Sequence, residues 1–431
     1  SDSDMHTLGY SFRPWDGAKS ITDGASILTY LEQTAADHNL GQYIRFQHHV
    51  RSASWSSVAS RWTLEVALSD KTDLITYTCA FLLICAGYYN YDRGYTPNFP
   101  NFDAYKGTVV HPQAWPDNLD YAGKRVLVIG SGATAVTLVP AMADQAAHVT
   151  MLQRSPTYVV AMPDEDKIAN GLRRILPKTV ASSLIRWKNV TIAEFFYRRA
   201  RRKPDKVRRW ILDKARKTLG STIDVDRHFN PSYDPWDQRL CLIPNGDLFK
   251  VLRSGKASVV TDEIETFTAS GLKLKSGEYL DADVIITATG LLVRPVGGID
   301  ITIDGQAVAL PNHWAYKGIA FSDVPNLVSI FGYINQSWTL RADLVCAYVC
   351  RLLNHMHATG TVSCTPRLRL SDEGMPKRPL IENFSSGYIQ RALPTLPHQG
   401  DRDPWINPQS YAQDKRSLSR GPIDDGVMTF L

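Results

Sequence analysis

The chain has 431 residues, of which 44% are hydrophobic and 21% charged, with a formal net charge of +5. This composition excludes disordered, collagen-like and disulfide-scaffold proteins and indicates two or three folded domains. The charge is uneven, because residues 198–217 hold 11 Lys or Arg against two Asp. We interpret this basic segment as a solvated helix face, with contact to an anionic membrane surface as the alternative, and predict no nucleic-acid partner.

The six cysteines form no CxxC pair. Cys346 and Cys350 lie four residues apart in an apolar helical pattern and are predicted to pack as small hydrophobic residues. We therefore predict no disulfide framework and no metal site, as is typical of a reducing cytoplasm. The longest apolar run, residues 80–89, is too short to span a bilayer.

The predicted elements begin with a β-rich region over residues 44–87, followed by a Pro- and Tyr-rich connection. A β-turn-α-β unit comes next, with strands at Arg125–Ile129 and His148–Gln153. Beyond it we predict basic amphipathic helices over about 164–226, strands over 257–260, 266–274 and 283–290, a helix from Trp338 to about Met356, and an extended C-terminal wrap.

A dinucleotide-binding pattern, GxGxxA, is matched by Gly130, Ser131, Gly132, Ala133, Thr134 and Ala135. The match follows an apolar strand and opens a helix, which is the context that supports such a pattern over an ordinary βα turn. Gly130 permits the tight turn, Gly132 leaves room for a pyrophosphate, and Ala135 lets the helix pack on the strand. The pyrophosphate then faces a helix N-terminus.

The end of the second strand indicates which nicotinamide cofactor binds. An NAD site would place a carboxylate there, to hold the ribose 2′-hydroxyl. Here the strand is followed by Arg154 and Ser155. A guanidinium and a hydroxyl suit a 2′-phosphate, so we predict NADPH; a surface arginine without a ligand is the alternative.

The segment YKGTVVHPQAWP, from Tyr105 to Pro116, resembles the FxGxxxHxxxWP fingerprint of Baeyer–Villiger flavin monooxygenases, with Tyr105 in place of Phe. Its fingerprint residues are Gly107, His111 and Trp115. In that family the segment links two domains and responds to NADPH. The resemblance thus implies that His111 and Trp115 organise motion without touching the substrate.

The resemblance extends through the whole chain and is especially strong to members that activate thioamide prodrugs. It implies an α/β fold of two Rossmann-like FAD/NAD(P)-binding domains, with the NADPH domain inserted into the FAD domain. We expect residues 1–105 to be the first part of the FAD domain, 106–290 the NADPH domain with its helical insertion, and 291–431 the second FAD part. The FAD-binding GxGxxG strand that opens family members is missing before Ser1, so we expect a fragment that is inactive by itself.

The resemblance also implies the site residues of the flavin. Arg239 matches the catalytic arginine, which would stabilise negative charge on the oxygenated flavin. Asp2 matches its acidic partner, and Val50 the position where the backbone meets the FAD adenine. The helix that starts at Trp338 would direct its N-terminus at the flavin pyrimidine. Read without the resemblance, these are a solvated arginine, a frayed terminus, a strand residue and a core helix.

The expected function is therefore an FAD- and NADPH-dependent Baeyer–Villiger monooxygenase that uses O2 to convert ketones to esters and to oxidise sulfides or thioamides. One alternative is a flavin-free NADPH-binding dehydrogenase or sensor. The other is an interaction module that uses the basic segment, which would add to the enzyme and not replace it. We expect a cytoplasmic protein, with residues 198–217 as the candidate contact to a membrane.

Overall fold

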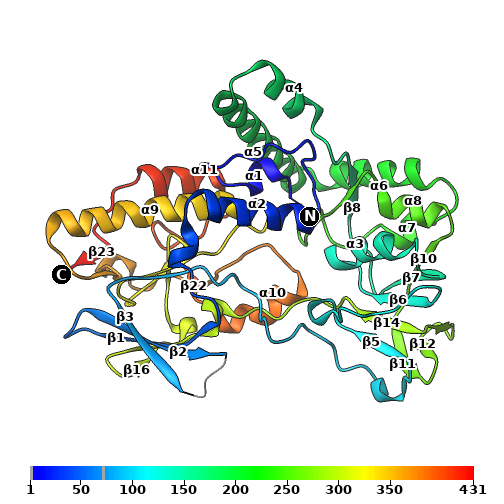
Figure 1. Cartoon of the computed structure of the whole chain (residues 1–431), viewed down its shortest axis with the longest axis horizontal. Helices are drawn as coiled ribbons and strands as arrows, with labels where there is room; N and C mark the ends of the chain where they lie inside the picture. Colours follow the sequence, from blue (N-terminus) through cyan, green and yellow to red (C-terminus); the bar gives the residue numbers. More distant parts are fainter. Residues whose placement is uncertain (1–2, 70–72) are drawn as a thin grey trace.

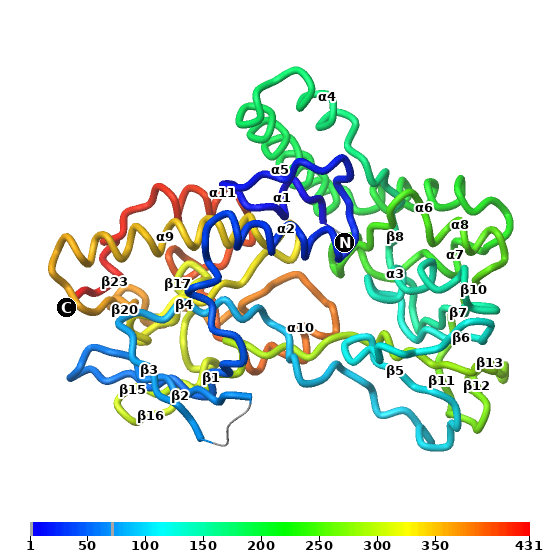
Figure 2. Tube along the Cα trace, in the orientation of Figure 1, coloured from blue at the N-terminus to red at the C-terminus, as the bar shows by residue number. Residues whose placement is uncertain are grey.

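The described residues, 3–69 and 73–431 of a computed structural model, form two lobes (Figure 1). One lobe combines the N-terminal and C-terminal parts of the chain, and the other holds its middle. The trace in Figure 2 passes into the second lobe before β5 (Thr108–Val110) and leaves it after β14 (Val284–Thr287). The middle of the chain is thus built as an insertion between two crossings.

The second lobe is organised around a five-stranded sheet in which every neighbouring pair is parallel. Its strands in spatial order are β10 (Ala257–Thr261), β7 (His148–Gln153), β6 (Arg125–Ile129), β14 and β5. Helix α3 (Ala133–Met142) connects β6 to β7, so the predicted β-turn-α-β unit is present with both strands at their predicted bounds. Helices or loops cover both faces of such a sheet, which explains why β6 and β14 are almost wholly apolar.

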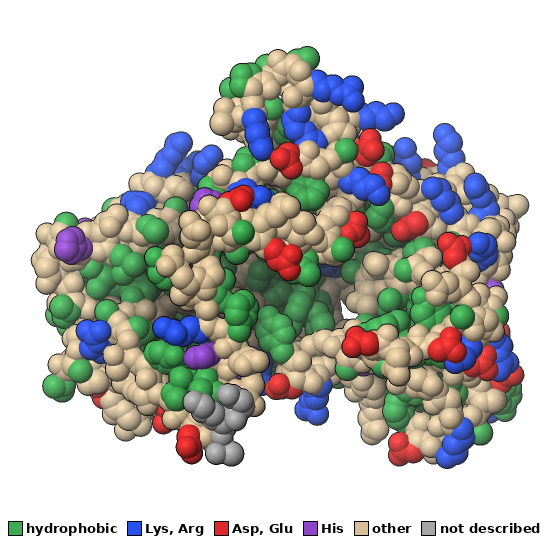
Figure 3. All heavy atoms as spheres, viewed as in Figure 1, with side chains coloured by type: hydrophobic (Ala, Val, Ile, Leu, Met, Phe, Trp, Pro, Cys, Tyr) green, Lys and Arg blue, Asp and Glu red, His purple; other side chains and the backbone are tan. Residues whose placement is uncertain are grey.

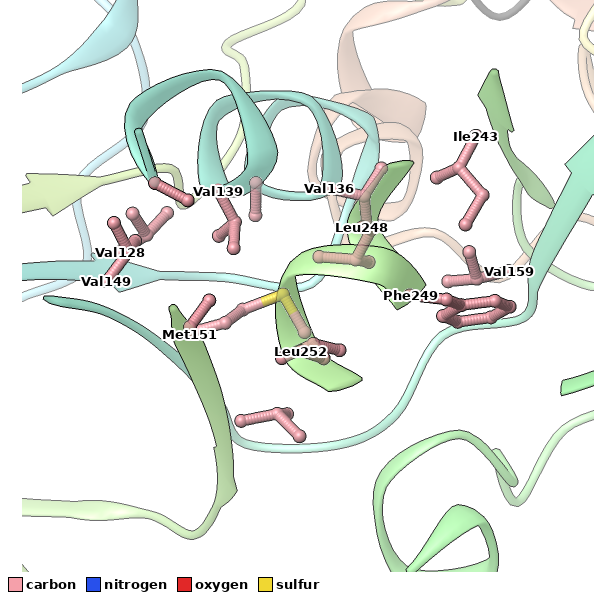
Figure 4. Packing of buried hydrophobic residues seen from close by; sticks show 14 of the residues in the cluster. Val128, Val136, Val139, Val149, Met151, Val159, Ile243, Leu248, Phe249 and Leu252 are labelled. Atoms are coloured by element: carbon pink, nitrogen blue, oxygen red, sulfur yellow. The ribbon is translucent and has the colours of Figure 1, made fainter. Parts of the chain in front are cut away.

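Alternate residues of β6 point into two different cores. Val126 and Val128 belong to the cluster that packs against α3 and α8 (Asp247–Arg253), part of which is shown in Figure 4. Leu127 and Ile129 belong to the cluster on the opposite face, beneath a three-stranded antiparallel meander. The meander strands are β11 (Ile264–Thr268), β12 (Gly271–Leu274) and β13 (Tyr279–Asp281). The single strand predicted over residues 266–274 is therefore wrong, because the chain turns at residues 269 and 270.

The basic region forms helices, as predicted. They are α4 (Lys167–Ile175), α5 (Lys178–Arg202), α6 (Pro204–Leu219) and α7 (Val225–His228). The side chain of Asp166 caps α4, and Pro177 and Pro204 mark the starts of α5 and α6. Helices α4 and α5 form a hairpin that projects at the top of Figure 1. Beside α6 lies the parallel pair of β8 (Val159–Met162) and β9 (Cys241–Pro244).

The first lobe has a mixed five-stranded sheet, in which β1 pairs antiparallel with β2 and parallel with β15. Its order is β16 (Gln306–Ala307), β15 (Asp300–Ile303), β1 (His48–Ser56), β2 (Arg61–Leu68) and β3 (Leu74–Cys79). A parallel pair, β4 (Leu82–Ile84) and β19 (Leu327–Ser329), lies apart from it. The remaining elements are α1 (Met5–Leu8), α2 (Gly24–Asp37), β17 (Ala315–Tyr316), β18 (Ala320–Phe321), β20 (Cys364–Pro366), β21 (Arg378–Pro379), α10 (Gly387–Ala392), β22 (His398–Gln399), α11 (Tyr411–Asp414) and β23 (Met428–Phe430).

Helix α9 (Trp338–Thr359) extends three residues beyond its predicted end and stops at Gly360, which has φ +69°. Its buried stripe includes Leu344, Tyr348 and Leu352. Cys346 and Cys350 are exposed, so their predicted packing in the core is wrong: both lie on the face of α9 away from that stripe. Across residues 3–69 and 73–431, the structure contains no helix with the length and apolarity needed to cross a membrane.

Candidate functional site

Two glycines shape the turn between β6 and α3, for different reasons. Gly130 has φ +139°, and a Cβ there would overlap the carbonyl oxygen of Ala288 at the end of β14. At Gly132, which precedes the first residue of α3, a Cβ would meet nothing within 4 Å. The turn is thus tight on the sheet side and open in front of the helix N-terminus. An open space at free backbone amides fits the pyrophosphate of a dinucleotide.

The hydroxyl of Ser131 ties this turn to the loop that follows β7. Its Oγ donates to the carbonyl oxygen of Ser155 at 3.1 Å and lies 2.9 Å from Oγ1 of Thr157. Arg154 and Ser155 are both exposed in this loop. Lys275 and, to a smaller extent, Arg154 lower the pKa of the Glu263 carboxyl. Arg154 follows β7 and Glu263 follows the parallel neighbour β10, so both lie at the carboxyl edge of the five-stranded sheet. A cation and a hydroxyl beside the turn fit a 2′-phosphate.

The linker that bears His111 and Trp115 passes over the N-terminal half of α3. Trp115, 36% exposed, lines a cavity of about 550 Å3 together with Thr134, Thr137 and Asp247. Burial raises the pKa of the Asp247 carboxyl above its ordinary value. We call this space the α3 cavity; its other lining residues are Pro112, Ala133, Val136, Leu138, Leu242, Ile243 and Pro244. It lies next to the open side of the Gly130–Ala135 turn.

The other two fingerprint residues hold the linker in place. A Cβ at Gly107 would lie 2.9 Å from the carbonyl oxygen of Asp283, so the absence of a side chain lets β5 approach the start of β14. The His111 ring packs directly against Gly94, and its Nδ1 accepts a hydrogen bond from the Gln113 amide at 3.2 Å. His111 Nε2 is buried with no hydrogen-bond partner among the described residues. A buried ring nitrogen without a partner marks a position that a ligand or an ordered water can satisfy.

Arg239 lies in the loop before β9, half-buried, and its charge reaches Tyr88 from a distant part of the chain. Burial raises the pKa of Tyr88 well above its ordinary value, and the Arg239 charge lowers it by a smaller amount. Tyr88 stacks on Trp338 with ring centroids 4.6 Å apart, and Phe331 and Tyr388 lie within 6.3 Å of it. The Arg239 charge therefore lies within electrostatic reach of Tyr88, which belongs to an aromatic cluster that follows the carboxyl end of β4.

The start of α9 adjoins this cluster. Trp338 is its first residue, and the preceding Ser337 makes no side-chain cap bond to the helix; instead its Oγ lies 2.6 Å from Oγ1 of Thr7. The side-chain oxygen of Gln336 is buried and accepts no hydrogen bond from the described residues. Uncapped amides and an unsatisfied amide oxygen fit a ligand with both acceptors and donors, such as a flavin pyrimidine ring.

The structure thus gathers the predicted residues into two groups. The Gly130–Ala135 turn, Ser155 and Trp115 form one, and Arg239 and Trp338 form the other around Tyr88. Val50 lies apart, half-buried in β1 directly before a β-bulge. Asp2 lies outside the described residues.

Sequence reasoning did not single out Tyr88, Phe331 or Tyr388. Of these, only Tyr88 had a usable signal, because it follows the small residues that end β4 at the edge of a parallel pair. Ligands bind at such carboxyl ends of strands.

Figure 3 shows a hollow between the two lobes whose floor is made of hydrophobic side chains.

Comparisons with known proteins are consistent with this geometry. A family model described as flavin-binding monooxygenase-like matches residues 16–199. The chain is 50% identical over 431 residues to the FAD-containing monooxygenase EthA of Mycobacterium tuberculosis, covering 100% of this chain and 87% of that protein. Among solved structures, a steroid monooxygenase bound to NADP superposes with a TM-score of 0.75 at 19% identity, over 100% of this chain and 90% of that one. The OTEMO complex with FAD and NADP gives 0.73 at 17% identity, over 100% and 91%.

The structural likeness confirms the predicted fold class, a mixed α/β fold with Rossmann-type nucleotide-binding domains. Both solved structures carry a dinucleotide cofactor by name, and both align along the full length of this chain. The two groups of site residues therefore belong to a fold that is known to present nucleotides at the carboxyl ends of its strands.

Proposed function

The chain belongs to the FAD-containing monooxygenases, and from this premise we propose that it is a Baeyer–Villiger monooxygenase with FAD and NADPH as cofactors. It inserts one oxygen atom of O2 into ketones, giving esters, while NADPH reduces the other atom to water. It also oxidises sulfides and thioamides. The observation that carries this proposal is that the Arg239 charge acts on Tyr88, which stacks on Trp338 at the start of α9.

In this proposal residues 106–290 bind NADPH, and residues 1–105 and 291–431 bind FAD. The amides of the Gly130–Ala135 turn hold the pyrophosphate, Arg154 and Ser155 the 2′-phosphate, and Trp115 covers the α3 cavity beside them. Bound FAD supplies the transfer of electrons from NADPH to O2. Val50 contacts the adenine part of FAD, and Asp2 orients Arg239.

Arg239 supplies the positive charge that the oxygen transfer requires. A guanidinium stays protonated at every pH at which the protein is folded, so it stabilises negative charge on oxygen without acting as an acid. Its half-buried position strengthens that effect relative to water. The raised pKa of Tyr88 keeps its hydroxyl neutral, and this hydroxyl donates to the Tyr89 hydroxyl at 2.9 Å, so Tyr88 itself adds no negative charge near Arg239.

Membership in the FAD-containing monooxygenases disfavours the flavin-free dehydrogenase that the sequence left open. The aromatic side chains of Phe331 and Tyr388 around Tyr88 favour apolar or aryl substrates over charged ones. Ketone, sulfide and thioamide groups are all neutral and fit this description.

The proposal is tested with the full-length protein, purified and supplied with FAD, NADPH, and either an aryl ketone or an aryl sulfide. Ester and sulfoxide are measured alongside NADPH consumption. We expect Arg239→Ala to reduce oxygenated product by about a hundredfold or more while NADPH binding persists, since the charge acts on oxygen transfer. Arg61→Ala, at an exposed arginine of β2, is the control and retains activity. Unchanged ester formation by Arg239→Ala would exclude the assigned role.

A further inference from the structure

The helical hairpin of α4 and α5 leaves large apolar side chains in solvent. Trp187 and Phe195 of α5 are each 67% exposed, and Ile175 at the end of α4 is 76% exposed. We define the hairpin crest as these three residues with Ile168, Val180 and Leu184, all of which are exposed. On α5, positions 180, 184, 187 and 195 follow helical spacing and so form one continuous stripe. An apolar stripe of this size on a projecting element marks a contact surface.

The same hairpin is strongly basic. Residues 167–202 contain ten Lys or Arg and one acidic residue, Glu194, which pairs with Arg198. Exposed cations stand at both ends of the crest: Lys167, Arg174, Lys178, Arg198, Arg199 and Arg202. Figure 3 shows hydrophobic and basic side chains together on this projection. The +9 charge of the hairpin exceeds the +5 net charge of the whole chain, so the rest of the molecule is net negative.

This combination fits an anionic lipid surface better than a second copy of the chain. In a symmetric dimer the crest would meet itself, which would bring two sets of exposed cations together, among them Lys167, Arg174 and Arg199. An anionic bilayer offers an apolar interior for Trp187 and Phe195 and phosphate groups for the flanking cations at the same time. The basic segment 198–217 fits less well, because among its large apolar side chains only Trp210 is exposed, so it offers no apolar stripe beside its cations.

The opposite side of α5 contacts the elements around the aromatic cluster. Arg186 donates to the Gly9 carbonyl at 2.7 Å and pairs with Asp343 of α9, also at 2.7 Å. Val190 packs against Tyr333 and Leu340, which flank Trp338 in sequence. One helix therefore carries the exposed crest on one side and supports the start of α9 on the other.

We propose that the hairpin crest of α4 and α5 docks the protein on anionic membrane surfaces, with Trp187 and Phe195 inserted at the level of the lipid headgroups. The flanking cations bind lipid phosphates, and α5 holds the aromatic cluster near the bilayer. This inference goes beyond the proposed oxygenation and does not depend on it.

Co-sedimentation of the full chain with vesicles tests the proposal without any activity measurement. One set of vesicles is pure phosphatidylcholine, and the other contains about one third phosphatidylglycerol. We expect binding to the anionic set that weakens at high salt. The double variant Trp187→Ser/Phe195→Ser should bind about tenfold more weakly, since two inserted aromatic side chains are lost. Leu370→Ser, at a leucine 86% exposed outside the hairpin, is the matched control and binds as wild type does.

Two outcomes would overturn the proposal. Equal sedimentation of wild type and the double variant would show that the crest makes no lipid contact. If the wild-type protein does not bind vesicles and sediments as a dimer, while the double variant sediments as a monomer, the crest is an interface between copies. Thermal unfolding of both variants, expected to match wild type because the substituted side chains are exposed, confirms that lost binding is not lost folding.

Discussion

Gly130 and Gly132 stand two residues apart, yet the same substitution has opposite expected effects at the two positions. Gly130→Ser forces a side chain against the Ala288 carbonyl at φ +139° and should destabilise the fold by about 1–3 kcal/mol. Gly132→Ser meets open space and supplies a favourable helix cap, so stability should hold or rise. Because Gly132→Ser fills the proposed pyrophosphate position, it alone should weaken NADPH binding without loss of stability. Chemical unfolding and NADPH titration of both variants separate the two effects.

A second residue-scale prediction concerns the fully buried Arg341, which pairs with Asp414 at 3.2 Å. The Tyr333 hydroxyl donates to the same carboxylate at 2.7 Å. Arg341→Met leaves a buried charge uncompensated and should cost about 3–5 kcal/mol in unfolding free energy. The double variant Arg341→Met/Asp414→Asn should recover part of that loss in urea unfolding.

The pH dependence of that loss has a definite sign. Burial raises the pKa of Asp414 in the folded protein despite the Arg341 charge, so ionisation of this carboxyl opposes folding as pH rises. Without the Arg341 charge, the pKa of Asp414 rises further, and ionisation of this carboxyl costs more folding free energy. The loss in Arg341→Met should therefore be larger at about pH 8 than at about pH 5. An equal loss at both pH values would show that Asp414 does not ionise in the variant.

Asp372 gives the opposite pH dependence. The Arg369 side chain, together with the Trp405 indole, lowers the pKa of this buried carboxyl to about 2. A depressed pKa contributes stability above the unfolded-state value and loses it as pH falls from about 4 to about 2. Asp372→Asn should lose about 1.5–3 kcal/mol at neutral pH. Its unfolding free energy should then vary less than that of wild type across the acidic range, as measured by unfolding at several pH values.

At the scale of elements, the linker over α3 carries the clearest expectation. Trp115 covers the α3 cavity but is 36% exposed, so Trp115→Ala should change the melting temperature little. If the cavity receives part of NADPH, the variant should show a raised KM for NADPH. Steady-state rates at varied NADPH concentration and a thermal melt of the same sample check both points. A large drop in melting temperature would instead make Trp115 a packing residue.

Local patterns predicted the elements whose determinants are local. Strands β6 and β7 and the start of α9 fall at their predicted residues, because apolar runs and turn residues define them within a few positions. The single strand predicted over 266–274 is wrong, because the chain turns at Ala269 and Ser270. Their strand-like neighbours hide this turn in the sequence, and the pairing of β11 with β12 sets it. The predicted burial of Cys346 and Cys350 is wrong for a similar reason. Helical spacing indicates that the two residues share one face of α9, but only packing decides which face is buried.

At the scale of the whole molecule, contacts between distant segments escape prediction. The turn at Gly130–Ala135 was predictable because one short motif contains it. The reach of the Arg239 charge to Tyr88, and the stacking of Tyr88 on Trp338, depend on how distant segments of the chain fold together, and no spacing in the sequence encodes that. Without the family resemblance, Arg239 reads as an ordinary solvated arginine.

The division of the site between lobes also leads to a prediction. All groups assigned to NADP+ lie within the lobe built on β6, β7 and α3, so NADP+ should bind without added FAD. At a hundredfold excess over its Kd, NADP+ should stabilise the protein by about 2.7 kcal/mol. Calorimetry with and without FAD measures this, with Gly132→Ser as the variant that shows no stabilisation. A requirement for FAD would mean that the NADP+ site is completed only across the lobes.

The hydrogen bond from Ser131 to the Ser155 carbonyl has a practical meaning for cofactor engineering. It joins the turn to the loop bearing Arg154 through a backbone atom, so side chains at 154 and 155 are exchangeable without breaking the link. Swapping Arg154 for an acidic residue would then redirect preference from NADPH toward NADH while the phosphate-binding turn keeps its shape. If Arg154 holds the 2′-phosphate as we propose, coenzyme choice is separable from coenzyme anchoring, and the protein is a starting point for a catalyst that uses the cheaper nicotinamide.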